Sequence, residues 1–249
     1  MEINTLPLDA ANADGSIQAD THSLYATMQT KVSFEMEGTF SEKRKMFFSK
    51  GSSAGIGKFG TTYLGDIESN TKNMGHSVTS TMSYSILGMP LTGADVCGSI
   101  GEPNAELCAR WYTVAAFQPF ARNHKHIGFS SQVPWAFNQI YQRSVTYQQV
   151  IQNAMYTKLH LIRYMNTQLT RIQTRGGTYY QPTFFEYHNE DEAYKNVQNN
   201  VLLGPALKLG VMATATGVTN TTYFFPAGRW CEVICHKGVD CCFTQSTSG

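Results

Sequence analysis

The chain has 249 residues, of which 42% are hydrophobic and 15% are charged, and its formal net charge is +1. This is enough apolar material for a sizeable core in one large domain, or in one domain and part of a second. The near-zero charge argues against nucleic-acid and acidic-membrane partners, and the lack of an apolar run of about 18 residues predicts no membrane-spanning helix.

Up to about residue 190, short apolar stretches alternate with helical patterns. The expected strands cover 46–49, 61–64 and 91–95, and a glycine-rich loop fills 51–60. The expected helices cover 24–29, 70–87, 104–117 and 137–172. This alternation is typical of parallel βα units.

Apolar spacing marks the faces of these helices that we expect to be buried. In 70–87 the apolar residues recur at every fourth position, at Met74, Val78, Met82 and Ile86. In 104–117, with Asn104 near the cap, one face carries Leu107, Trp111, Val114 and Ala115. In 137–172 the candidates are Tyr141, Val145, Ile151, Met155, Leu159, Ile162 and Leu169.

The last part of the chain is strand-like. A strand is expected at 183–187, directly after Pro182, and shorter ones follow at 201–203, 206–209 and 223–225. This tail predicts a small β module attached after the βα units.

Two of the expected strands end in an acid, at Asp66 and at Asp95. Acidic side chains at the carboxyl ends of parallel strands occupy the position where a TIM barrel keeps its chemistry. Taken alone, Asp66 would more often be a helix N-cap, because aspartate at a loop-to-helix junction caps well.

The six cysteines allow more than one interpretation. Cys97 and Cys108 flank a glycine-containing loop and a helix start, a separation suited to a local disulfide. Zinc, disulfides or free thiols are all open for the other four cysteines, although a vicinal pair is poor zinc geometry; these are Cys231, Cys235, Cys241 and Cys242. Asn220 begins an Asn-Thr-Thr glycosylation sequon, which mildly favours a secretory context.

Several blocks in the right order resemble glycoside hydrolase family 31, the α-glucosidase type, over most of the chain. They include Gly65-Asp66, the stretch Gly93-Ala94-Asp95-Val96-Cys97-Gly98, and Arg122-Asn123-His124. Further blocks lie at 49–59, 106–111, 182–187, 203–207 and 223–230. The resemblance implies an α/β fold, the C-terminal half of a (β/α)8 TIM barrel over 1–192, followed by part of a β-sandwich-like C-terminal domain over 193–249.

The resemblance also implies roles for individual residues. Asp66 matches the general acid/base, which in a retaining glycosidase works with a second, ionised carboxylate about 5 Å away. Asp95 and His124 match positions that hydrogen-bond the sugar hydroxyls, and Arg122 matches an arginine that forms an ion pair in the site. Cys97 and Cys108 match a pair that is usually a disulfide in secreted and lysosomal members.

The chain departs from the family pattern around the site. Lys50 stands in place of a sugar-binding arginine, Thr62 and Tyr63 in place of a His-Trp pair, Ile67 in place of an asparagine, and Ser99 in place of an aromatic wall. Lys50 keeps the charge without the fork geometry, and Tyr63 can still stack on a sugar. These changes fit either relaxed constraint on catalysis or a shifted substrate.

The segment that carries the family's nucleophile has no match in the chain. The acids nearest the beginning of the sequence are Glu2, Asp9 and Asp14, and none of them stands in a nucleophile-like motif. We therefore expect a fragment that needs a complementing N-terminal half for turnover.

Three functions follow as expectations. The first is a retaining hydrolase of terminal α-linked glucose in oligosaccharides or α-glucans, without metal or organic cofactor. The second is a non-catalytic carbohydrate-binding or scaffold protein, and the third is another family activity, such as an α-xylosidase or an endoplasmic-reticulum glucosidase. A secreted or lysosomal location is implied for the parent enzyme, although residues 1–5 do not resemble a signal peptide.

Overall fold

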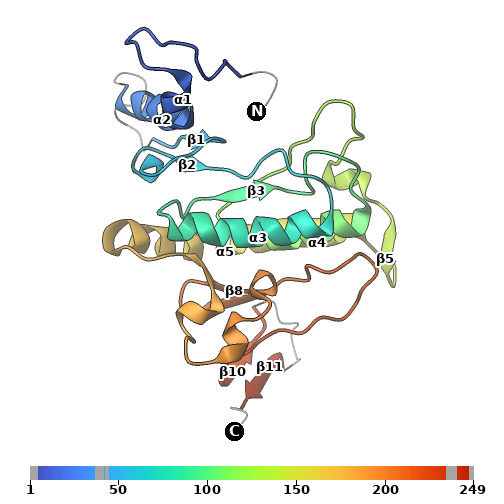
Figure 1. Cartoon of the computed structure of the whole chain (residues 1–249). Helices are drawn as coiled ribbons and strands as arrows, with labels where there is room; N and C mark the ends of the chain where they lie inside the picture. The colour runs from blue at the N-terminus through green and yellow to red at the C-terminus, as the bar shows by residue number, and fades with distance from the viewer. Residues whose placement is uncertain (1–4, 37–41, 43–44, 234–239, 247–249) are drawn as a thin grey trace.

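The structure is a computed structural model, and it describes residues 5–36, 42, 45–233 and 240–246 (Figure 1). The chain begins with the helices α1 (Gln18–Thr21) and α2 (Tyr25–Glu35). Short 3-10 helices punctuate the loops, and these are His22–Leu24, Ile56–Lys58, Pro134–Ala136, Thr183–Phe185, Asp191–Tyr194 and Val197–Asn199. In the described ranges no helix combines the length and the apolar character that a membrane span requires.

Four short strands lie parallel to one another in the order of the chain. β1 (Phe48–Ser49) pairs with β2 (Thr61–Thr62), and β3 (Gly93–Asp95) pairs with β4 (Phe120–Arg122). A parallel bridge between Leu64 and Ala94 joins the two pairs. The carboxyl ends of all four strands therefore face the same edge, as the sequence predicted for parallel βα units.

Glycine is required where β3 and β4 meet. A Cβ atom added at Gly93 would lie 1.7 Å from the carbonyl oxygen of Phe120, an atom of the rigid backbone. Any side chain at position 93 would thus separate the two strands that carry Asp95 and Arg122. The glycine serves close backbone approach, which is the usual reason for glycine inside a strand.

Three long helices, α3 (Thr71–Ile86), α4 (Ala105–Ala115) and α5 (Tyr147–Arg175), pack beside these strands (Figure 1). Asn70 and Asn104 cap α3 and α4, because their side-chain oxygens each accept a backbone N–H three residues later at 2.8 Å. The predicted faces of these two helices are confirmed, with Ile86 as the exception, since its side chain is 47% exposed. The buried residues are Met74, Val78, Met82, Leu107, Trp111, Val114 and Ala115.

The helix predicted over 137–172 was wrong at its start. Residues 140–146 form a hairpin of β5 (Ile140–Gln142) and β6 (Val145–Thr146), and α5 begins at Tyr147. Arg143 and Ser144 between them adopt positive φ angles of 44° and 71°, as a tight hairpin turn requires. Thr146 and Gln149 then form a reciprocal capping box that starts the helix.

The predicted burial along α5 was also largely wrong. Ile151 is fully buried and Leu169 is half-buried, whereas the other candidates are exposed. The exposed ones are Tyr141, Val145, Met155, Leu159 and Ile162. The face that packs on the core contains small and polar residues between its apolar ones, namely Ala154, Thr157, Leu161, Met165 and Gln168. The prediction counted only large apolar side chains, and it therefore assigned the wrong face of α5 to the core.

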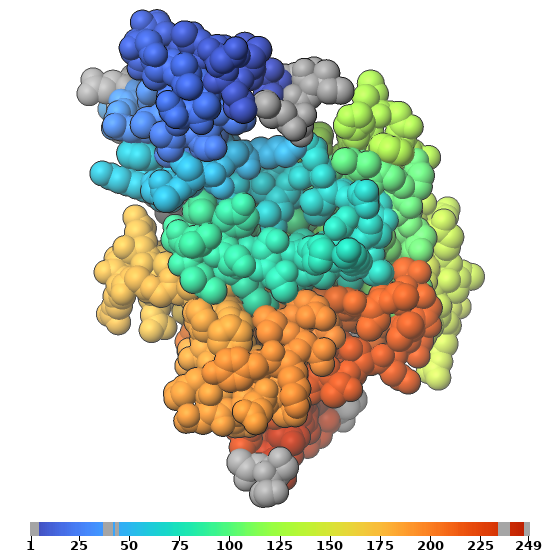
Figure 2. Space-filling model, in the orientation of Figure 1, coloured from blue at the N-terminus to red at the C-terminus, as the bar shows by residue number. Residues whose placement is uncertain are grey.

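Antiparallel strands dominate after α5. β7 (Tyr180–Pro182), β8 (Asn200–Leu203) and β9 (Leu207–Gly210) form a three-stranded antiparallel sheet, and β10 (Gly228–Cys231) pairs with β11 (Cys242–Gln245). In Figure 2 this orange-to-red part lies below the blue-green part with the parallel strands. The strands predicted at 201–203 and 206–209 are confirmed.

Two predicted strands, 183–187 and 223–225, are not strands. Residues 183–185 form a 3-10 helix, in which Phe184 stacks on the ring of Tyr194 at a centroid distance of 4.9 Å. The backbone N–H of Phe224 donates to the side chain of Asn200 at 3.0 Å, so it does not enter a strand ladder. Phe225 also packs edge-on against Phe243 at a centroid distance of 5.1 Å, so in both segments an aromatic ring packs against a residue of another element.

Candidate active site

The parallel strands bring Tyr63, Asp66, Asp95 and Arg122 to one edge. The backbone N–H of Asp95 donates to the carbonyl of Leu64 at 3.0 Å, and that of Val96 donates to the carbonyl of Arg122 at 2.7 Å. These bonds align the ends of β2, β3 and β4. The four residues named above, which the sequence analysis selected for the site, are thus neighbours in space.

Asp95 and Arg122 form the best-defined part of the site. The Asp95 side chain is fully buried, and Nε of Arg122 donates to its Oδ1 at 2.9 Å. This hydrogen bond raises the pKa of Arg122 above its ordinary value. The guanidinium also lies 4.5 Å from the centroid of the Tyr63 ring, which is a cation–π contact.

The second oxygen of Asp95 is a buried acceptor without a donor among the described residues. Oδ2 is buried and accepts no hydrogen bond from any residue that the structure describes. Leaving a buried acceptor unpaired costs about 1–3 kcal/mol, more when it is charged. A hydroxyl group that donates to Oδ2 would remove this cost.

Asp66 lies after β2 with a positive φ of 54°, and it is not a helix cap, because Asn70 caps α3. Its carboxylate forms an ion pair with Lys50, and both side chains are about half exposed. The hydrogen bond from Lys50 lowers the pKa of Asp66, and the nearby charges of Lys50, His124 and His126 lower it further. These contacts therefore favour the ionised form of Asp66.

We expect the substitution Lys50→Met to raise the pKa of Asp66. The lost hydrogen bond is the largest cause of the lowered pKa, so the carboxyl should return toward its ordinary value. A carbon-13 titration of the Asp66 carboxyl measures this directly, with the exposed Lys72→Met as the matched control. An unchanged pKa of Asp66 in Lys50→Met would show that the ion pair does not set it.

The sign of the accompanying stability effect follows from the lowered pKa. The ion pair stabilises the fold above the unfolded-state pKa of aspartate, and this contribution is lost as the pH falls through the lower folded-state pKa. Since both partners are half exposed, the stabilisation should amount to less than about 1 kcal/mol.

His124 is exposed. Gln132, which the sequence analysis did not select, holds the loop that carries His124. Nε2 of the buried Gln132 lies within hydrogen-bond distance of the carbonyls of Gly98 and His124, at 3.0 Å each. It also reaches the side chain of Asn123 at 2.8 Å. Gln132 thus connects the loops that follow β3 and β4. Its spacing in the sequence gave no signal of this role.

Disulfides hold two of the loops. Cys97 is joined to Cys108, with their Cα atoms 4.6 Å apart, so the loop after Asp95 is anchored to α4 as predicted. Cys231 is joined to Cys242 across the β10–β11 hairpin, which removes this pair from the zinc alternative. Cys235 lies outside the described residues. Within the described ranges, no group of three His, Cys, Asp or Glu side chains could hold a metal.

The described acidic residues near the beginning of the chain, Asp9 and Asp14, do not lie at the strand edge with the candidate site. Asp9 and Asp14 are exposed, and the carboxylate of Asp14 accepts hydrogen bonds from the backbone and hydroxyl of Ser16. Glu2 lies outside the described residues. Asn220 is exposed in the loop before β10, so its glycosylation stays a prediction.

Carboxylates gathered at the carboxyl ends of parallel strands, beside helices that pack on those strands, are typical of an α/β barrel. Residues 3–168 match the TIM-barrel domain of the glycosyl hydrolases family 31, and the chain belongs to that family.

Known relatives agree with this membership. The chain is 32% identical to lysosomal alpha-glucosidase of Mus musculus over 215 residues, which are 86% of this chain and 22% of that protein. It is 31% identical to intestinal sucrase-isomaltase of Oryctolagus cuniculus over 234 residues, 92% of this chain and 12% of the relative. The chain therefore spans about a fifth or less of the length of these relatives.

Two solved structures show the fold. A cycloalternan-degrading enzyme from Trueperella pyogenes superposes with a TM-score of 0.79 at 19% identity, covering 97% of this chain and 34% of the other. A chain in the structure of the ER glucosidase II heterodimeric complex superposes with a TM-score of 0.77 at 22% identity, covering 90% of this chain and 24% of the other.

Proposed function

We propose that this chain supplies the acid/base and part of the sugar-binding site of a retaining α-glucosidase-type hydrolase. The substrate would be terminal α-linked glucose in oligosaccharides or α-glucans. The names of the relatives support this substrate class, since they include lysosomal alpha-glucosidases. The observation that carries the proposal is the buried Asp95, held by Arg122 with one oxygen unpaired, at the same strand edge as Asp66.

The mechanism divides the work between two carboxyl groups. Asp66 would protonate the leaving oxygen and then, as the carboxylate, deprotonate the attacking water. The nucleophile would come from outside these 249 residues. Its negative charge, placed about 5 Å away, would raise the pKa of Asp66 and oppose the effect of Lys50. Asp95 and His124 would bind the sugar hydroxyls, Lys50 and Tyr63 would contribute to the same subsite, and Arg122 would hold Asp95.

The arrangement of the chain belongs to the same proposal. Residues 1–192 would be the C-terminal half of the barrel, and 193–249 the beginning of a β-sandwich-like domain. No metal or cofactor is needed for this chemistry. The two described disulfides and the exposed Asn220 support a secreted or lysosomal parent enzyme.

A non-catalytic carbohydrate-binding protein is the second candidate. The observation in its favour is the Lys50–Asp66 ion pair, which keeps the acid/base candidate ionised. Both candidates require sugar binding at the strand edge, and only the first requires turnover.

The binding half of the proposal can be tested on the chain itself. We expect glucose to bind with millimolar affinity, because a sugar hydroxyl can donate to Oδ2 of Asp95, which accepts no hydrogen bond from the described residues. Asp95→Asn should weaken binding at least tenfold, while the amide oxygen can still accept from Arg122. Isothermal titration calorimetry measures the affinity, with the exposed Asp20→Asn as control. Equal affinity for Asp95→Asn and the unchanged chain would overturn the assignment of Asp95.

A further inference from the structure

A cavity of about 380 Å³ lies where three segments of the chain meet. Its walls come from α4, from the β5–β6 hairpin with the start of α5, and from residues 212–219. In Figure 2 the last two of these segments adjoin at one side of the molecule, yellow-green against orange-red. The volume is in the range of small-molecule sites, roughly 300–1,000 Å³. None of the candidate residues at the strand edge lines it.

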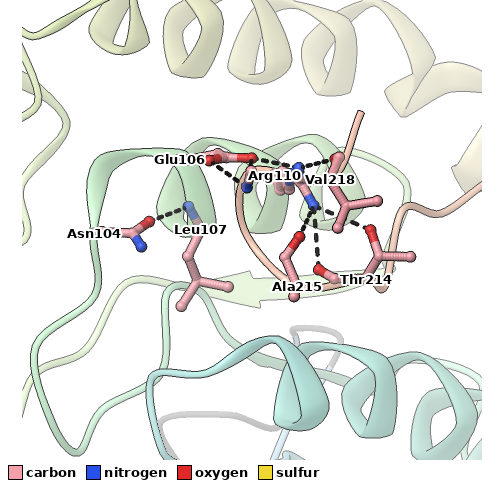
Figure 3. Close-up of polar contacts among 8 residues, drawn as sticks. Asn104, Glu106, Leu107, Arg110, Thr214, Ala215 and Val218 are labelled. Atoms are coloured by element: carbon pink, nitrogen blue, oxygen red, sulfur yellow. Dashed lines mark hydrogen bonds and ion pairs between the residues drawn. The ribbon is translucent and has the colours of Figure 1, made fainter. Parts of the chain in front are cut away.

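The charged part of the cavity lining is an ion pair without net charge (Figure 3). Arg110 is paired with Glu106 one helical turn earlier, and its guanidinium also donates to the carbonyls of Thr214 at 3.2 Å and Val218 at 2.7 Å. The backbone N–H of Gly217 donates to Oε2 of Glu106 at 3.0 Å. These bonds hold the 214–218 loop on α4. Because each charge already has its partner, the cavity favours neither an anion nor a cation.

The walls favour a ligand with one apolar face. The rings of Tyr141 and Tyr147 form a corner, with centroids 5.4 Å apart and planes tilted by 49°. Val150 and Met212 continue the apolar lining. Gln142 and Thr219 are exposed at the cavity and offer an amide and a hydroxyl. A sugar ring has this pattern, with C–H groups on its faces and hydroxyls around its edge.

We infer that this cavity is a second saccharide site, which binds a glucose unit of an oligosaccharide by stacking on Tyr141 and Tyr147. The choice of a sugar among neutral amphipathic ligands rests on the proposed function. Bound sugar would touch all three segments, so it would also hold the 212–219 stretch against α4.

Methionine methyl NMR tests this inference on the whole chain, because Met212 lines the cavity. Maltotriose is titrated into the chain labelled with carbon-13 at the methionine methyls, and Met28, which is 53% exposed on α2, serves as the reference. We expect the Met212 methyl signal to shift with saturation in the millimolar range. Tyr141→Ala should weaken binding about three- to tenfold, the loss expected for one stacked ring. Tyr141→Phe should retain it.

The controls separate this inference from the proposed function. Tyr156→Ala, which removes a tyrosine 52% exposed on α5, should leave the Met212 titration unchanged. Asp95→Asn should also leave it unchanged, even if sugar binding at the strand edge is lost or absent. The inference is overturned if Met212 does not respond to maltotriose, if Tyr141→Ala binds as well as the unchanged chain, or if p-cresol binds more tightly than maltotriose.

Discussion

Replacing Arg122 by methionine should lower the free energy of unfolding by about 3 kcal/mol, the lower end of the cost of breaking a buried ion pair. Asp95 would stay behind as a fully buried carboxylate without its cationic partner. The lower end applies because the Arg122 side chain is 36% exposed, so water can reach part of the gap. Urea unfolding followed by circular dichroism measures the change.

The matched control for this prediction is Arg163→Met, which removes an exposed arginine on α5. It should change stability by less than about 0.5 kcal/mol. The double variant Asp95→Asn/Arg122→Met should recover much of the loss, since no buried charge is then left unpaired. If Arg122→Met lowers the free energy of unfolding no more than Arg163→Met does, the Asp95–Arg122 ion pair does not stabilise the site.

Local signals in the sequence were enough to predict the middle of the fold. The helix α4 follows from Asn104 near its cap, and both α3 and α4 follow from apolar residues spaced three or four apart, so these signals lie within or next to the helix itself. The capping box at Thr146 and Gln149 is a signal of the same kind. Used as a signal, that motif predicts a helix that starts at Tyr147, as α5 does.

Long-range contacts account for the errors. Residues 183–187 look like a strand because they are aromatic, but Phe184 stacks on Tyr194, ten residues further along the chain. The buried face of α5 includes Thr157 and Gln168, which no apolar pattern selects. In both places tertiary packing overrides local preference.

The sequence indicated which residues share the strand edge, but it did not indicate their electrostatics. Strand-end position and family resemblance selected Lys50, Asp66, Asp95 and Arg122. Only the structure shows that Lys50 pairs with Asp66 and that Asp95 keeps one oxygen unpaired. Gln132 was missed because its contacts lie in loops that meet only after folding.

The second large effect concerns Asp66. Under the proposed mechanism, the chain joined to a preceding barrel segment that supplies the nucleophile should hydrolyse maltose. The corresponding segment of the lysosomal alpha-glucosidase of Mus musculus is a suitable donor. Asp66→Asn should then lower kcat/KM about 10²- to 10⁴-fold, the usual contribution of a general acid/base. The loss should be smaller with substrates whose leaving group needs no proton.

The most direct measurement is hydrolysis of 4-nitrophenyl α-glucoside by the purified 249-residue chain, side by side with its Asp66→Asn variant. A retaining mechanism cannot form its covalent intermediate without a nucleophile, so neither protein should release nitrophenol above the buffer rate. Turnover by the unchanged chain, whether or not Asp66→Asn reduces it, would contradict this account, because a nucleophile within these 249 residues would then complete the site.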